Sequence, residues 1–380
     1  MQASNATEQF TVTSSIEGMQ RWLHAHLDDG AHPLDAIDVN AARSVISALT
    51  SIEPGPWAHA WLAAADEFAQ EAERCERAGA PAEAREAWWQ AYRFSFVARF
   101  PAPMHPAKVE AYDVSREYFL KAVSLDEPPI ERVEVTIEDP NREGRGDVPF
   151  YVAHPLCRTI APPPVVIVFG GIDMWKEETY VRTADLRARG VATVHVDIPG
   201  VGESPLLAGV DAERMWTPVI DWISSSNFDS DRLGVLGLSF GGYWATKLAH
   251  THCDRVRAAV NWGGGVHHTF QPAWQERSRV ATSSIMELHA ARARIFAGRT
   301  FEDWLAGCAE LSLVDQGVLD LSSSPLLLIN GQDDRQSDAT DILLALEHGD
   351  PKTVRLFPGG HMGTGPVGAT VTDWMVSQLS

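Results

Sequence analysis

A serine in a glycine-rich turn is the first feature of the sequence that could do chemistry. Ser239 lies in Gly237-Leu238-Ser239-Phe240-Gly241, between the apolar run 232–236 and a helical pattern over 243–250. A buried strand that turns sharply into a helix is the setting that a G-x-S-x-G nucleophile elbow requires. Glycines are needed in the turn because side chains at these positions would collide with the strand and the helix. The partial positive charge of the helix N-terminus stabilises a developing oxyanion. The pattern predicts a nucleophile at Ser239, against the simpler interpretation of a turn with an incidental serine.

A serine hydroxyl is a weak nucleophile, so it needs a base and a carboxylate that orients the base. His361 follows Pro358-Gly359-Gly360 just after the last apolar run, and it is the predicted base. Asp334 is the predicted orienting carboxylate; Asp333 is the alternative, which would otherwise hold the loop through backbone hydrogen bonds. Two further histidines near a strand end are reserve candidates for the base, His267 and His268.

The charge that develops on the attacked carbonyl needs two backbone N–H donors. The first is expected from Phe240, the residue after the nucleophile. The second is expected from Ile172 in the loop Gly170-Gly171-Ile172-Asp173, with Gly171 as the near alternative. Gly171 and Asp173 are also predicted to lie against the substrate, although Asp173 could equally make a plain Asx-turn.

Apolar runs and helical patterns alternate over the second part of the chain, which predicts an α/β fold with a mostly parallel sheet. Ligands bind beyond the carboxyl ends of the strands in such a sheet, and the candidate residues all follow apolar runs. The expected strands cover 130–138 and 148–153, paired as a hairpin, then 165–169, 191–196, 232–236, 256–262, 325–330 and 353–357. Residues 266–318 interrupt the alternation with a helical excursion, and helices are expected at 179–189 and 215–224.

The first part of the chain has only helical patterns, from residue 16 to about 123, with prolines or capping residues at the starts. We therefore expect two domains, an all-helical domain over 1–128 and a catalytic domain over 129–380. The helical domain is rich in aromatic residues, which either form its core or line a pocket for an aromatic substrate.

The composition of the chain limits the classes of molecule that the protein is expected to bind. The net charge is −20, from 31 basic and 51 acidic residues, and nucleic acids or anionic membranes require the opposite charge. The 4 cysteines have no zinc spacing, and no phosphate or dinucleotide loop is complete, so no metal or cofactor is expected. The N-terminus lacks a secretory signal pattern, and no apolar run is long enough to span a membrane, so we expect a cytoplasmic protein with a small-molecule substrate.

Taken together, the motifs over about residues 130–380 resemble the α/β-hydrolase superfamily. The resemblance rests on Gly237–Gly241, the run Asp197-Ile198-Pro199-Gly200-Val201-Gly202-Glu203-Ser204, Gly331-Gln332-Asp333-Asp334 and His361, in the usual order. The helical domain ahead of them, with Gly170–Glu178, resembles the FrsA-like esterase group, which includes dihydroxypseudooxynicotine hydrolase and polyketide-shortening hydrolases. Relatives often have Gly-Leu-Asp where this chain has Gly171-Ile172-Asp173.

This narrower resemblance implies that the helical domain caps the active site. It also implies cleavage of a carbon–carbon bond next to a ketone, or of an ester, in an aromatic or polyketide-like substrate. Thioester hydrolysis and acyl transfer are alternatives within the same chemistry, and a regulatory binding protein without turnover is the alternative from another class. By analogy with other large helical caps, a homodimer is a candidate assembly.

Overall fold

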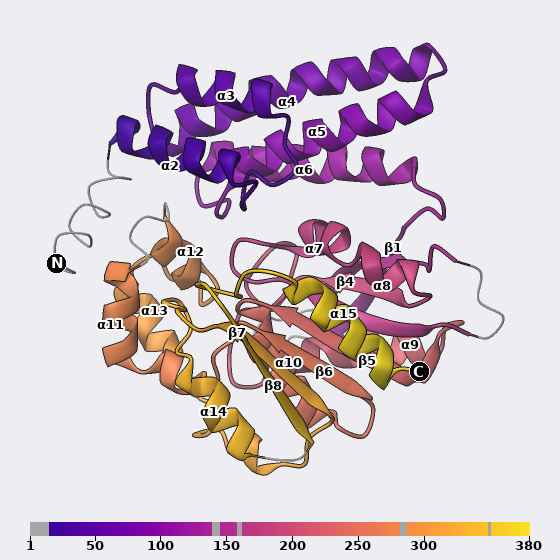
Figure 1. Cartoon of the computed structure of the whole chain (residues 1–380), viewed down its shortest axis with the longest axis vertical. Helices are drawn as coiled ribbons and strands as arrows, with labels where there is room; N and C mark the ends of the chain where they lie inside the picture. The colour runs from indigo at the N-terminus through magenta and orange to yellow at the C-terminus, as the bar shows by residue number, and fades with distance from the viewer. Residues whose placement is uncertain (1–14, 139–144, 158–161, 282–286, 349–350) are drawn as a thin grey trace. The chain divides into compact units, whose positions relative to one another are not determined.

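The helical and the strand-rich parts of the sequence form separate units in the computed structural model of the protein (Figure 1). The structure describes residues 15–138, 145–157, 162–281, 287–348 and 351–380. By contacts, one unit is drawn from residues 1–129 and 282–288, and the other from 130–281 and 289–380. The predicted division at residues 128 and 129 stays a prediction of domain organisation.

The first unit is built from helices whose starts follow the expected signals. Asp38 accepts a hydrogen bond from the Ala41 backbone N–H at 2.8 Å and so caps the start of the helix that follows it. Fully buried aromatic side chains, among them Trp57 and Trp61, make the core of this unit. Its helices are α2 (Ile16–Asp28), α3 (Val39–Ala48), α4 (Pro54–Arg77), α5 (Pro81–Arg99) and α6 (Pro106–Ser124).

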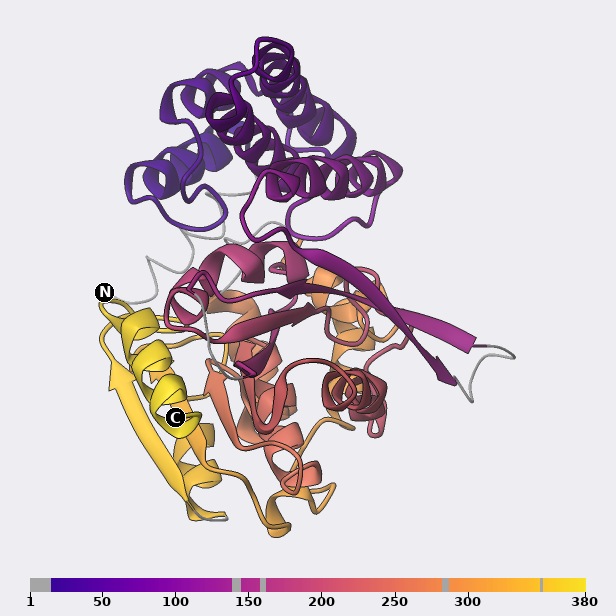
Figure 2. The ribbon, with the colours of Figure 1, turned by 90° about the vertical axis from the view of Figure 1, so that its right-hand side faces the viewer.

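The second unit contains an 8-stranded sheet in the order β1-β2-β4-β3-β5-β6-β7-β8. The strands β1 and β2 pair as the expected hairpin, and β2 joins the sheet antiparallel to β4, whereas the other neighbours are parallel. Figure 2 shows this hairpin projecting from the edge of the sheet. The strands are β1 (Glu131–Glu138), β2 (Arg145–Ala153), β3 (Pro164–Phe169), β4 (Ala192–Val196), β5 (Asp229–Leu238), β6 (Ala258–Trp262), β7 (Leu326–Gly331) and β8 (Lys352–Phe357).

Alternate residues of the buried strands pack against different helices, as the pleat requires. In β3, Val166 and Val168 share a core with Leu186 and Met375, from α8 and α15. Phe169 instead packs against the tilted ring of Trp216, which packs against Trp244 of α10, with ring centres 4.9 and 5.5 Å apart. The helices of this unit are α7 (Lys176–Arg182), α8 (Ala184–Ala188), α9 (Thr217–Ser224), α10 (Gly241–Thr251), α11 (Pro272–Ala281), α12 (Leu288–Arg294), α13 (Phe301–Cys308), α14 (Thr340–Glu347) and α15 (Val367–Gln378).

The main local difference from the sequence prediction lies after β3. The expected helix over 179–189 is two short helices, α7 and α8, which meet at Thr183. The helix α7 also begins earlier, because the Glu178 carboxylate accepts a hydrogen bond from the Trp175 N–H at 2.6 Å and caps the first turn. The helical excursion is present as α11, α12 and α13. None of the described helices is long and apolar enough to cross a bilayer.

Candidate active site

The turn at Ser239 has the strained geometry that its sequence predicts. Ser239 lies between β5 and α10 with φ +54°, a left-handed conformation that is uncommon outside glycine. Its backbone N–H donates to the Trp262 carbonyl of β6 at 2.8 Å, which ties the turn to the neighbouring strand. A Cβ added to Gly241 would lie 2.3 Å from the Gly170 carbonyl oxygen, so glycine is required there. The turn therefore fixes the serine side chain at the carboxyl end of the sheet.

Three side chains that are far apart in the sequence form one hydrogen-bonded chain at this end. Ser239 Oγ lies 2.7 Å from His361 Nε2, and His361 Nδ1 lies 2.8 Å from Asp334 Oδ2. The Asp334 side chain is fully buried, whereas that of His361 is 16% exposed. Asp333, the alternative carboxylate, is exposed, and its N–H donates to the Gly359 carbonyl at 2.9 Å. This arrangement can activate a hydroxyl: the imidazole is positioned to take the serine proton and the carboxylate to orient the imidazole.

Asn330 at the end of β7 joins the two loops that supply His361 and Asp334. Its Nδ2 donates to Asp334 Oδ2 at 2.7 Å, and its Oδ1 accepts from the Met362 N–H at 3.0 Å. The Gln336 N–H also donates to Asp334 Oδ1 at 2.7 Å. Burial by itself would raise the pKa of Asp334, but the charge and hydrogen bond of His361, with the bonds from Gln336 and Asn330, outweigh burial and lower it. The carboxylate is thus held ionised, and sequence reasoning missed Asn330 although it ends an apolar strand.

The loop after β3 lies against the serine. A Cβ added to Gly171 would lie 2.8 Å from Ser239 Cβ and 3.3 Å from the Phe240 backbone nitrogen. Ile172 is buried, and its carbonyl accepts a hydrogen bond from Trp175 Nε1 at 2.9 Å. Gly171 therefore lies against both Ser239 and the Phe240 backbone nitrogen, so this loop borders the place where an oxyanion would bind. The role of Phe240 and Ile172 in binding an oxyanion, and that of Asp173 and Gly171 in binding substrate, stay predictions.

A largely buried group of charged side chains, which we call the lysine cluster, anchors the loop after β3. It consists of Lys176, Glu177, Asp197 and Glu203. The Lys176 side chain is fully buried, and its Nζ lies 2.7 Å from Asp197, 2.9 Å from Glu203 and 3.1 Å from Glu177. Asp197 also accepts hydrogen bonds from the backbone N–H groups of Lys176 and Glu203, at 3.0 and 2.9 Å. The cluster thereby ties the loop after β3 to the loop after β4.

The reserve candidates His267 and His268 lie in a separate loop after β6. The His267 ring lies 2.7 Å from the Ser312 hydroxyl. The buried Asp341 of α14 accepts four backbone N–H groups from this loop, with Val266 and Thr269 on Oδ2 and His267 and His268 on Oδ1, at 2.6 to 3.1 Å. One carboxylate therefore anchors the whole loop. No group of three or more metal-ligating side chains stands together within the described ranges of the chain.

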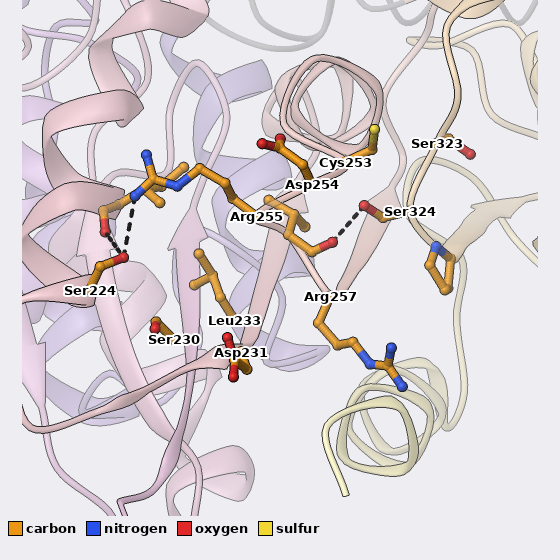
Figure 3. A pocket seen from close by; sticks show the side chains of 13 residues that line it. Ser224, Ser230, Asp231, Leu233, Cys253, Asp254, Arg255, Arg257, Ser323 and Ser324 are labelled. Carbon is orange, nitrogen blue, oxygen red and sulfur yellow. Dashed lines mark hydrogen bonds between the residues drawn. The ribbon is translucent and has the colours of Figure 1, made fainter.

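A pocket of about 420 Å³ lies elsewhere in this unit (Figure 3). It is lined at the amino-terminal ends of β5, β6 and β7 by residues such as Ser230, Arg257 and Pro325. Because ligands of such sheets bind at the carboxyl ends of the strands, we place the candidate site at Ser239 and not in this pocket.

Comparison with known proteins agrees with this fold. The sequence profile described as "Esterase FrsA-like" matches residues 41–353. The chain belongs to the FrsA-like esterase family. It is 30% identical over 327 residues to 2,6-dihydropseudooxynicotine hydrolase of Paenarthrobacter nicotinovorans, over 82% of each chain. It is 27% identical over 252 residues to the α/β hydrolase UcsC of an Acremonium species, over 61% of this chain and only 51% of the relative.

Solved structures confirm the predicted α/β-hydrolase fold. The crystal structure of 2,6-dihydroxy-pseudo-oxynicotine hydrolase superposes with a TM-score of 0.71 at 25% identity, covering 94% of this chain and 95% of that one. Wild-type AbyA5 superposes with a TM-score of 0.69 at 22% identity, covering 95% and 99%. Family and fold together identify this member of the FrsA-like family as an enzyme, a hydrolase.

Proposed function

We propose that the protein is a serine hydrolase in which Ser239 attacks a carbonyl carbon, His361 takes and returns the proton, and Asp334 orients His361. The backbone N–H groups of Phe240 and Ile172 hold the oxyanion, and water releases the acyl group. The observation that carries this proposal is the 2.7 Å contact between Ser239 Oγ and His361 Nε2. A non-catalytic binding protein would have no need of this contact on a strained turn.

Within that class, our first choice of reaction is cleavage of a carbon–carbon bond next to a ketone, in an aromatic or polyketide-like substrate. The resemblance to hydrolases of this group supports it, and so does the relative named for 2,6-dihydropseudooxynicotine. Ester hydrolysis is the second candidate, supported by the relatives named esterase FrsA. Thioester hydrolysis and acyl transfer use the same acyl-enzyme and differ in the leaving group or acceptor.

Labelling with a fluorophosphonate probe tests the nucleophile. We expect the native protein to be labelled at Ser239 and the Ser239→Ala variant not to be labelled. Its kcat/KM should fall by roughly 10⁴ or more, as for other serine nucleophiles. Unlabelled native protein, or labelling that survives the substitution, would contradict the proposal. Mass spectrometry of turnover on aryl esters, thioesters and β-diketones then identifies the bond that is cleaved.

A further inference from the structure

A buried guanidinium near the site has a hydrogen-bond donor with no partner in the described part of the chain. Arg292 of α12 is only 6% exposed, and its Nη2 donates to Gln336 Oε1 at 3.2 Å. Its Nη1 has no hydrogen-bond partner among the residues that the structure describes. A buried donor of a charged group is costly to leave unpaired, so such a group calls for a functional explanation.

The contacts of Arg292 connect it to two sides of the Ser239 site. Gln336, its partner, donates its backbone N–H to Asp334 at 2.7 Å. The guanidinium carbon lies 5.8 Å from the centre of the Trp304 ring, which is 6.1 Å from the ring of Phe240. Burial lowers the pKa of Arg292, while Cys308 and then the nearby charges of Asp334 and Asp173 oppose that shift. An arginine nevertheless keeps its proton inside proteins, so the group is a fixed cation.

The helix that carries Arg292 is held against the loop after β4. Arg294 Nη1 donates to the Gly200 carbonyl at 2.9 Å, and the Ala208 N–H donates to the Ile295 carbonyl at 2.9 Å. These two hydrogen bonds hold the C-terminal end of α12, which carries Arg292, in place against this loop. A donor that is positioned before the reaction stabilises new charge without having to reorganise, which is the condition for electrostatic catalysis.

Carbon–carbon cleavage creates charge at a position where ester hydrolysis creates none. In a β-diketone, Ser239 Oγ bonds to one carbonyl carbon and its proton passes to His361. When the intermediate collapses, the carbon–carbon bond breaks and its electron pair becomes an enolate, with its charge largely on the second carbonyl oxygen. His361 returns the proton to the α-carbon, which yields a ketone, and water releases the acyl group as a carboxylic acid. An ester loses an alcohol instead and has no second carbonyl oxygen to carry charge.

We propose that Arg292 Nη1 donates to this second carbonyl oxygen and makes the site selective for β-dicarbonyl substrates. The inference rests on the proposed function, because it requires attack by Ser239. The competing explanation is that Arg292 only balances the charge of Asp334. In that case both reactions depend on it to the same degree, since both use the Ser239–His361–Asp334 chain.

The test compares two substrates on the full-length enzyme, a neutral aryl ester (4-nitrophenyl acetate) and a β-diketone (1-phenyl-1,3-butanedione). For Arg292→Gln we expect kcat/KM on the diketone to fall roughly 10²-fold, in the range seen when an oxyanion donor is removed, and ester hydrolysis to stay close to wild type. Arg292→Lys keeps a buried cation and should retain part of the diketone activity. The control is Arg279→Gln, at an exposed arginine of α11, which should change neither reaction.

Equal losses on ester and diketone would overturn the inference, as would a wild-type enzyme that hydrolyses the ester and leaves the diketone intact. Should Arg292→Gln fail to fold, the ratio of the two activities in Arg292→Lys decides, and an unchanged ratio overturns the inference. Failure of the proposed function looks different: neither substrate turns over, and Ser239 takes up no fluorophosphonate.

Discussion

Two networks of charged and polar side chains lie at the carboxyl end of the same sheet, and they differ in whether a substrate can reach them. In the lysine cluster, the fully buried Lys176 ammonium is surrounded by three carboxylates. The Ser239–His361–Asp334 chain instead runs from a fully buried carboxylate to a 16% exposed imidazole and a half-buried hydroxyl. The carboxylates of the first network are paired with the ammonium and with neighbouring side chains such as Arg132 and Tyr151, whereas the second network ends in groups that a substrate can reach.

The comparison shows that a perturbed ionisation equilibrium does not by itself mark the chemistry. Burial raises the pKa of Glu177 to about 7, aided by repulsion from Asp197 and opposed by Lys176. Yet Glu177 is bonded to Lys176 and to the Tyr151 hydroxyl, an arrangement that holds loops together. The contact between a nucleophile and a base distinguishes the candidate site, and only the second network has it.

The largest effect should come from Asp334→Asn. The amide keeps the shape of the side chain but favours the wrong tautomer of His361, so kcat should fall by about 10⁴ in an aryl-ester assay. The matched control is Asp333→Asn at the exposed neighbouring position, which should change kcat little. Comparable losses in both variants would mean that Asp334 is not the orienting carboxylate.

Lys176→Met tests whether the lysine cluster is structural. Removing the cation leaves the buried carboxylates of Glu177 and Asp197 without their counter-charge, so the free energy of unfolding in urea should fall by about 3–5 kcal/mol. Arg189→Met is the control, because the ion pair of Arg189 with Asp373 is 47% and 62% exposed and should contribute at most about 1 kcal/mol. Lost activity at unchanged stability would instead place Lys176 in the chemistry.

Gly171→Ala perturbs the Ser239–His361–Asp334 chain without replacing any of its three side chains. The new Cβ would lie 2.8 Å from Ser239 Cβ and 3.3 Å from the Phe240 nitrogen, where the oxyanion is expected. We expect kcat/KM to fall about 10²-fold, as on loss of one oxyanion donor. In the control Gly209→Ala the added Cβ meets nothing within 4 Å. Full activity in Gly171→Ala would show that the oxyanion binds elsewhere.

The smallest effect concerns the pH dependence of stability. The pKa of Glu177 is raised from 4.5 in the unfolded chain to about 7 in the folded one, so the native state binds the additional proton. Its contribution to stability is therefore complete below about pH 4.5 and is lost as the pH rises through about 7. Glu177→Gln should flatten this fall by about 2 kcal/mol in urea titrations between about pH 5 and 8. Parallel pH profiles for variant and wild type would contradict the raised pKa.

The sequence predicted the parts of this molecule that depend on local patterns. Apolar runs gave the strands, and the residues just beyond them included Ser239, Asp334 and His361. What it missed depends on tertiary contacts. The break at Thr183 interrupts a pattern that is continuous in the sequence, and the pairing of β2 with β4 has no local signal. Arg292 and Asp341 lie on helices where a charged residue normally faces solvent, so only the structure shows them buried.

Asp341 occupies an anion-binding arrangement of backbone N–H groups in the loop after β6. In other folds, several successive backbone N–H groups that point at one anion form a phosphate-binding site. Here the protein supplies the anion itself, from a helix more than seventy residues further along the chain. The glycine-rich stretch Gly263–Gly265 therefore leads into an anion-binding loop that the Asp341 carboxylate already occupies. A nucleotide phosphate would have to displace this side chain in order to bind there.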